Sequence, residues 1–215
     1  MPAAKAESRT GRRLHALTKI ELATEDDSAQ DAHRAIGDAT DAFEAVKQPL
    51  GGQRTGKIVK PRVYVETSVI SYLTARPSND LRAMANQNAT VEWWETQRSK
   101  YDLVVSEFVI AEASLGHPDA AKLRLSVADE IATLKVTEEV RLLGKVLITR
   151  GALPSNAELD AYHVAVAAVN GVDYLLTWNC KHIANAHMRP KIEAVCKALG
   201  YAPPVICTPD ELTEI

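Results

Sequence analysis

The sequence predicts an α/β protein in which a central parallel sheet of about five strands is flanked by helices and preceded by an N-terminal extension. Beyond residue 60, short β-branched runs alternate with longer segments whose apolar residues recur at helical spacing. Such alternation is typical of a parallel sheet covered on both faces. The residues before this point carry blocks of like charge instead, which indicates a tail rather than a core.

Charge divides the extension, residues 1–60, into three blocks. Residues 1–20 carry five Lys or Arg and one acid, residues 21–46 carry eight acids and one Arg, and the remainder carries four Lys or Arg and no acid. Apolar residues at helical spacing within 32–46 favour one amphipathic helix, and the stretch KQPLGGQRTGK that follows is typical of a flexible linker. We therefore expect the folded domain to comprise residues 61–215.

The folded domain divides into elements at recognisable signals. The expected strands are residues 62–66, 101–106, 132–136, 172–177 and, at an edge of the sheet, 204–209. The expected helices are residues 79–100, 107–116, 117–131, 137–151, 154–171 and 188–200. The first of these helices has one apolar stripe, formed by Leu81, Met84, Val91 and Trp94. Thr137 is expected to cap the fourth helix, and Ser155 and Glu158 have the spacing of a capping box at the fifth.

Composition excludes several classes of protein. The net charge of -3 gives no general basic field for nucleic acid, so any contact with RNA needs a local patch. Three cysteines without a C-x-x-C pair argue against a disulfide framework and favour a reducing cytoplasm. No stretch approaches about 18 consecutive apolar residues, so we expect a cytoplasmic protein without a membrane segment.

Acidic residues lie where an α/β sheet binds its ligands, outside the carboxyl ends of the strands. Glu66 ends the first strand, Glu112 lies on the helix after the second, and Asp160 lies on an apolar helix before the fourth strand, which Asn179 follows. Each acid alone can be a helix N-terminal charge or part of a solvated face. Together, on elements that converge and without a Lys or Arg beside them in sequence, they need a compensating charge.

A hard divalent cation would supply that charge. Oxygen ligands favour Mg²⁺ or Mn²⁺ over zinc, and such an ion lowers the pKa of bound water and polarises a phosphoryl oxygen. The pattern therefore favours metal-assisted hydrolysis of a phosphodiester. Ser68 is placed to hydrogen-bond a ligand carboxylate or the water, whereas Thr67 is expected to point elsewhere. Zinc bound by Cys180, His182 and His187 is disfavoured because their spacing matches no usual zinc motif.

Four stretches of the folded domain resemble PIN-domain proteins of the VapC-like toxin type: YVETSVISYLTARPS, VSEFVIAEAS, LDAYHVAVAAVNGVDYLLTWNCKHI and VICTPDEL. The resemblance implies a Rossmann-like sheet and a divalent-metal endoribonuclease that acts on RNA as the toxin of a type II toxin-antitoxin system. It also implies a cognate antitoxin protein and a homodimer. By the same resemblance, Glu66 matches the family's first Asp, Ser68 the accompanying hydroxyl, Glu112 the helix glutamate, Asp160 the next acid, and Asn179 the position of the last acid.

Two departures from that family leave two functions open. Glu66 replaces an Asp and keeps a carboxylate, whereas Asn179 keeps an oxygen but loses a charge. We expect an active ribonuclease with Glu66, Glu112 and Asp160 as metal ligands and with Asn179 and Ser68 as further catalytic-site residues. The alternative is a weakened or inactive module that binds RNA or protein. A nucleotide-binding protein is disfavoured because no glycine-rich phosphate loop follows any strand.

The extension has three interpretations. Its acidic helix can be a tethered arm over basic residues beside the site, the whole segment can be a disordered extension, or the start codon can be misassigned.

Overall fold

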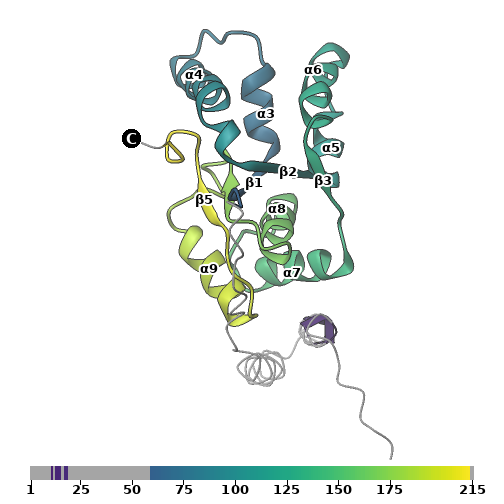
Figure 1. Cartoon of the computed structure of the whole chain (residues 1–215). Coiled ribbons are helices and arrows are strands. Elements are labelled where there is room, and N and C mark those ends of the chain that lie inside the picture. The colour runs from purple at the N-terminus through teal and green to yellow at the C-terminus, as the bar shows by residue number, and fades with distance from the viewer. Residues whose placement is uncertain (1–10, 12, 16, 19–58, 214–215) are drawn as a thin grey trace, which may run out of the picture.

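The computed structural model describes residues 11, 13–15, 17–18 and 59–213 (Figure 1). Within this part of the chain, five parallel strands form one sheet in the order β3-β2-β1-β4-β5. The strands are β1 (Arg62–Val65), β2 (Asp102–Ser106), β3 (Ala132–Leu134), β4 (Tyr174–Leu176) and β5 (Val205–Cys207). This architecture confirms the predicted fold class, an α/β protein with a parallel sheet of five strands flanked by helices.

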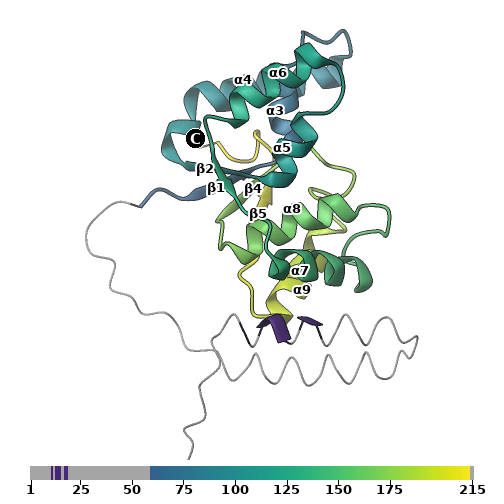
Figure 2. The same cartoon turned by 90° about the vertical axis from the view of Figure 1, so that its right-hand side faces the viewer.

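Helices cover the sheet from two sides. Figures 1 and 2 both show α3 to α6 on one side of the sheet and α7 to α9 on the other. Their bounds are α3 (Thr67–Thr74), α4 (Leu81–Thr96), the 3₁₀ helix η1 (Arg98–Lys100), α5 (Glu107–Ala113), α6 (Pro118–Ala128), α7 (Glu138–Thr149), α8 (Glu158–Val169) and α9 (Arg189–Ala198). None of the helices among the described residues combines the length and apolar character needed to cross a membrane.

The order of the strands places a switch point beside β1. The chain builds β1, β2 and β3 outward in one direction, then returns to place β4 on the other side of β1 and β5 beyond it. Strand order therefore reverses between β1 and β4, and ligands of open α/β sheets bind in the crevice at such a point. The backbone N–H of Glu66 bonds the carbonyl of Leu176 at 3.0 Å, which joins the carboxyl ends of the two strands.

The core lies around β1 and the helix α8. Val63, Tyr64 and Val65 have no exposed surface, and the Ala- and Val-rich stretch of α8 after Asp160 is buried as well. Removing this apolar surface from water contributes roughly 25 cal/mol per Å² to the free energy of folding. The acids next to these segments are consequently held by a rigid, apolar frame.

Two local expectations are wrong, and one helix was not predicted. No element was expected at residues 67–74, where Glu66 begins α3 by accepting a hydrogen bond from the Ser68 N–H. Ser155 does not cap α8, because a turn closed by the Ala157 N–H and the Pro154 carbonyl delays the helix to Glu158. Most of the apolar stripe of α4 faces outward, and the buried face of that helix carries Gln87, Thr90 and Trp93.

Part of the N-terminal extension contacts the folded domain. Leu17 has no exposed surface, and Arg13 donates a hydrogen bond of 2.6 Å to the carbonyl of Gly200. The guanidinium of Arg13 also lies 4.7 Å from the ring centroid of Tyr201. These contacts tie residues before the expected boundary at 60 to the segment that follows α9. The amphipathic helix and the linker expected within residues 19–58 lie outside the described residues.

The three cysteines are expected to differ in reactivity. Burial raises the pKa of the Cys196 and Cys207 thiols to about 12, whereas Cys180 is exposed. Because the thiolate is the reactive form, native protein should react with a thiol reagent such as DTNB at Cys180 alone, and the other two thiols should react after unfolding. Absorbance titration of native and urea-unfolded protein measures this. A Cys180→Ser variant that still reacts rapidly in the native state would contradict the expectation.

Candidate active site

The carboxylate of Glu66 lies at the switch point and is only 6% exposed. Its Oε1 accepts the Ser68 backbone N–H at 3.1 Å, and its Oε2 accepts the hydroxyl of Ser68 and, at 2.7 Å, that of Thr177. The loop after β4 therefore holds the residue at the end of β1. Ser68 also accepts the backbone N–H of Trp178 at 2.8 Å, which fixes its position. The expected bond from Ser68 to a carboxylate is present.

Glu112 lies beside Glu66 but comes from α5. Its Oε2 accepts a hydrogen bond from the hydroxyl of Thr67 and one of 2.9 Å from the Nε2 of His163. The expectation that Thr67 points away from the site is therefore wrong. Oε1 of Glu112 accepts no hydrogen bond within the described residues, and the side chain is 26% exposed. The site thus contains one carboxylate oxygen that is still free to bind a ligand.

Aromatic packing sets the position of α5 against α8. The rings of Phe108 on α5 and Tyr162 on α8 are stacked, with their centroids 5.1 Å apart and their planes 8° apart. Phe108 also meets the ring of His163 edge-on at 6.3 Å. Because α5 carries Glu112 and α8 carries Asp160, this packing fixes the two acid-bearing helices relative to each other.

A buried chain of hydrogen bonds runs behind Glu112. The Tyr64 hydroxyl lies 2.6 Å from both the hydroxyl of Ser106 and the Nδ1 of His163, and His163 continues the chain to Glu112. Burial raises the pKa of Tyr64 well above its usual value, so its hydroxyl keeps a proton to donate. Both ring nitrogens of His163 are therefore engaged, one by Tyr64 and one by Glu112.

His163 and Glu112 stabilise each other's charged forms. Burial alone would lower the pKa of His163, but the hydrogen bond to Glu112 and the charges of Glu66, Glu112 and Asp160 raise it. Burial would raise the pKa of Glu112, but the hydrogen bond and charge of His163 and the bond from Thr67 lower it. The carboxylate of Glu112 consequently stays ionised near neutral pH.

Asp160 is engaged by the loop after β4. Its Oδ1 accepts the amide of Asn179 at 2.8 Å, and its Oδ2 lies 2.7 Å from the Nδ1 of His182. The carbonyl oxygen of Asn179 accepts the His182 backbone N–H at 3.1 Å, so both ends of that amide are in use. Asn179 therefore orients Asp160 in this arrangement and does not offer a free oxygen.

The ligand atoms fit a cation between the two glutamates. Glu66, Glu112 and His163 each offer one ligand atom, and these atoms lie within 4.8 Å of one another. Neighbouring ligands of Mg²⁺ at about 2.1 Å lie about 3 Å apart, so a small rotation of the side chains closes the set. His163 has no free nitrogen, and its Nε2 is better assigned to holding Glu112, as histidines and carboxylates do around metal ligands. The remaining donors are carboxylate oxygens, which suit Mg²⁺ or Mn²⁺.

The structure thus divides the residues expected at the site into two neighbouring groups. Glu66, Ser68 and Glu112 lie together, with Thr67 and Thr177 as hydroxyl donors. Asp160 and Asn179 lie together with His182, and Asp160 is not among the three residues whose ligand atoms converge. The charge of Asp160 still acts on His163, which connects the two groups.

Two residues of the site were not expected from the sequence. Tyr64 bonds His163, and His163 bonds Glu112 and offers a ligand atom within 4.8 Å of those of both glutamates. The signal for His163 is its position three residues after Asp160 on a helix otherwise rich in Ala and Val. The ion pairs of Glu112 and Asp160 within the described part of the chain involve histidine alone, which leaves the negative charge of the site undercompensated.

Comparison with protein-family models and with curated proteins finds no match. Among solved structures, one match is the crystal structure of VapC20 from Mycobacterium tuberculosis, a toxin that cleaves the sarcin-ricin loop. The two chains are 18% identical, and the match covers 53% of this chain and 86% of that chain with a TM-score of 0.42. Similarity at this level supports no conclusion about activity, so the function of this chain is inferred from the residues of its own site.

Proposed function

We propose that this chain is a divalent-metal-dependent endoribonuclease of the PIN type that acts in the cytoplasm as the toxin of a type II toxin-antitoxin system. The main support is the pairing of Glu66 and Glu112 at the switch point between β1 and β4, where Oε1 of Glu112 accepts no hydrogen bond from the described residues. Mg²⁺ or Mn²⁺ bound there would acidify water and polarise the phosphodiester. The antitoxin protein and the homodimer belong to the same proposal and rest on the sequence resemblance.

The residues of the chain have distinct tasks in this proposal. Glu66 and Glu112 hold the cation, and the hydroxyls of Ser68 and Thr177 keep the carboxylate of Glu66 in place. Asp160 is the third ligand of the proposal, and it reaches the cation only if its bonds to Asn179 and His182 are rearranged. Charges that are already held in position stabilise the negative charge that develops on the oxygens of the reacting phosphate in the transition state.

A second candidate function is a weakened or inactive module that binds RNA or protein. The observation that favours it is the engagement of both carboxylate oxygens of Asp160, one by Asn179 and one by His182. With Asn179 in place of an acid, the site has one fewer negative charge, and affinity for a hard cation follows ligand charge.

A metal titration separates the two functions. The full chain is incubated with total RNA in EDTA, Mg²⁺ or Mn²⁺, and its thermal unfolding is followed under the same conditions. The nuclease is expected to cut RNA only with metal and to gain about 2.7 kcal/mol of stability at a metal concentration 100 times the dissociation constant. A chain that shows neither effect is not a metal-dependent nuclease.

Replacing Asp160 by Asn is expected to lower metal-dependent cleavage by on the order of 10²-fold without unfolding the protein. The amide keeps the shape of the side chain and can still accept the bond from Asn179, and its neutrality relieves repulsion with the two glutamates. Cleavage rate and thermal midpoint measure the two effects. Glu193→Gln on the exposed face of α9 is the matched control and should change neither. Full activity of the Asp160 variant would remove this residue from the proposal.

A further inference from the structure

A cavity of about 520 Å³ opens from the candidate active site. It begins at Ser68, whose hydroxyl bonds Glu66, and extends along α3 toward the start of α4. The polar residues that line it are Ser68, Ser71, Tyr72, Arg76, Ser78 and Gln87. None of the described residues that line it carries a carboxylate, so the cavity offers hydroxyls, an amide and a guanidinium beside a site that is itself negative. This lining suits a ligand that brings both polar edges and negative charge.

The far end of this cavity is held open by Gln87. Its side-chain carbonyl accepts the backbone N–H of Ser78 at 2.9 Å, and its amide donates to the backbone carbonyl of Arg76 at 2.8 Å. The backbone at Arg76 is therefore fixed against α4. The exposed guanidinium of Arg76 makes no hydrogen bond or ion pair with any residue in the described part of the chain. It is available for an anion, and a guanidinium binds phosphate with two parallel hydrogen bonds.

Tyr72 lies between Arg76 and the carboxylates along α3. Its ring packs edge-on against Trp178, with centroids 6.0 Å apart, and Trp178 is itself fixed by a 2.7 Å bond from its Nε1 to Thr90. The Tyr72 hydroxyl has no hydrogen-bond partner among the described residues. A ring held in this way at the wall of a cavity is a surface on which a base can stack.

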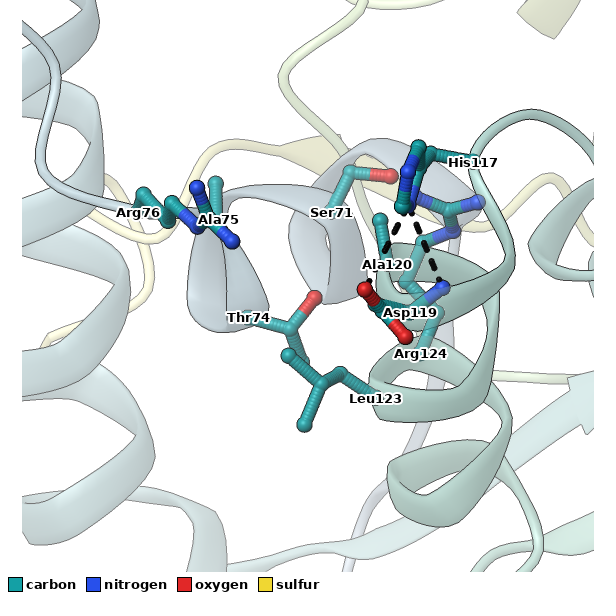
Figure 3. A pocket seen from close by; sticks show the side chains of 9 residues that line it. All are labelled: Ser71, Thr74, Ala75, Arg76, His117, Asp119, Ala120, Leu123 and Arg124. Atoms are coloured by element: carbon teal, nitrogen blue, oxygen red, sulfur yellow. Dashed lines mark hydrogen bonds and ion pairs between the residues drawn. The ribbon is translucent and has the colours of Figure 1, made fainter.

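A second cavity, of about 340 Å³, continues from the first and shares Ser71, Ala75 and Arg76 with it. Figure 3 shows Ser71 and Thr74 of α3 facing the residues of α6 across this space, with Arg76 on the rim. The acidic residue that lines the second cavity is Asp119, whose Oδ2 lies 3.8 Å from the Nδ1 of His117. The guanidinium of Arg124 donates hydrogen bonds to the backbone carbonyls of Ala113 and Leu115. The groove therefore passes Arg76 and runs on toward α6.

We propose that these two cavities form the path of a single-stranded RNA segment next to the cleaved bond, with one base against Tyr72 and one phosphate on Arg76. The proposal rests on the nuclease function proposed above. From Ser68 to Thr74 the helix α3 rises about 9 Å, which spans roughly three stacked nucleotides at about 3.4 Å each. RNA is favoured over a protein segment because the described residues of the first cavity supply hydroxyls and the Arg76 guanidinium and no large aliphatic side chain, and those of the second cavity add Leu123 alone.

Binding without catalysis tests this path. The full chain is titrated in EDTA against a fluorescein-labelled ten-nucleotide single-stranded RNA of mixed sequence and against the same RNA in a duplex. Arg76→Gln and Tyr72→Ala are each expected to weaken single-strand binding by about tenfold, and Arg76→Gln should reduce the salt slope of log K by about one. Arg82→Gln, an exposed position on α4 outside both cavities, should stay within about twofold. Tyr72→Phe keeps the ring, so it should bind nearly as tightly as the unaltered chain.

Several outcomes overturn the inference without touching the nuclease function. These are equal losses for Arg76→Gln and Arg82→Gln, no loss for Tyr72→Ala, and a duplex bound as tightly as the single strand. In the cleavage assay, Arg76→Gln should raise KM with kcat nearly unchanged. If the unaltered chain cleaves RNA with Mn²⁺ and Arg76→Gln leaves KM unchanged, the RNA path is rejected and the nuclease function stands. If the chain binds single-stranded RNA through Arg76 and Tyr72 but does not cleave it, the binding groove is supported and the nuclease function is rejected. If the two substitutions weaken capture of a protein and leave RNA binding intact, the groove is a protein-binding site and the inference is wrong.

Discussion

Replacement of Glu66 by Gln is expected to reduce metal-dependent RNA cleavage by on the order of 10³-fold. The amide fits the same space and can still accept the backbone N–H of Ser68, so α3 keeps its cap. What is lost is the negative charge next to Glu112, and with it half of the carboxylate pair at the switch point. The measurement is the rate of cleavage of a defined RNA in Mn²⁺, with the thermal midpoint measured in EDTA as a check on folding.

Measurements of thermal stability distinguish a loss of metal binding in Glu66→Gln from a loss of folding. The unaltered chain should gain stability from Mn²⁺, whereas Glu66→Gln should have a nearly normal midpoint in EDTA and gain much less from the metal. Glu95→Gln, at an exposed position of α4, serves as the control and should behave like the unaltered chain in both assays. A Glu66→Gln variant that cleaves RNA at the original rate would mean that Glu66 only caps α3.

Local signals predicted most of the fold because most elements follow their own sequence pattern. The helix α7 begins at Glu138 and is capped by Thr137, whose hydroxyl accepts the Val140 N–H, as expected. No element was predicted for the residues of α3, where Thr67, Val69 and Ile70 are β-branched and give a weak helical signal. Its helical state depends on the local cap from Glu66 and on the burial of these three side chains, and only the burial is a tertiary effect.

The prediction of which face of α4 is buried was also wrong, because apolar periodicity alone does not decide it. Its buried side chains are polar or large, and each has a partner outside the helix: Gln87 bonds the backbone of Ser78 and Arg76, Thr90 bonds Trp178, and the Trp93 ring nitrogen donates to the carbonyl of Leu212 at 2.8 Å. Periodicity counts apolar residues and cannot register a buried glutamine or threonine that is satisfied by a partner outside its own helix. A polar residue with a specific partner can therefore occupy the inner face while Leu81 faces solvent.

The acids of the site could be found from the sequence, but their partners could not. An acid in an apolar segment is costly wherever it lies, so Glu66, Glu112 and Asp160 stand out without a structure. The bond from His163 to Glu112 spans 51 positions and that from Tyr64 to His163 spans 99, and no local pattern encodes either distance. Only the fold shows that His163 hydrogen-bonds Glu112 and that Asn179 hydrogen-bonds Asp160.

His163 connects Tyr64 to Glu112 in a continuous series of hydrogen bonds. His163 is 1% exposed and lies between a buried hydroxyl and a carboxylate, so an apolar replacement removes one hydrogen bond from each of them and leaves Tyr64 with Ser106 and Glu112 with Thr67. An unsatisfied buried donor or acceptor costs about 1–3 kcal/mol, and more when the group is charged. The cost falls on the same carboxylate that is proposed to bind the cation, which couples the stability of the core to the geometry of the site.

Replacement of His163 by Leu is therefore expected to lower the free energy of unfolding by about 3–5 kcal/mol, the range for breaking a buried charged pair. Urea unfolding in EDTA measures this loss without any contribution from metal. His187→Leu, at an exposed position, is the matched control and should change stability by less than about 0.5 kcal/mol. A loss as small as that of the control would show that His163 is a space-filling residue.

A double-mutant cycle with Tyr64→Phe then tests whether the residues act as one unit. Tyr64→Phe removes only the hydroxyl and should cost about 1–2 kcal/mol, since Ser106 and His163 each lose a partner. If the three residues act as one unit, the double variant should be more stable by about 1 kcal/mol than the sum of the two single losses predicts. The reason is that replacing His163 already removes the hydrogen bond that Tyr64→Phe would otherwise break. Additive losses would mean that Tyr64 bonds chiefly Ser106, and that Glu112 is held by His163 and Thr67 without support from the sheet.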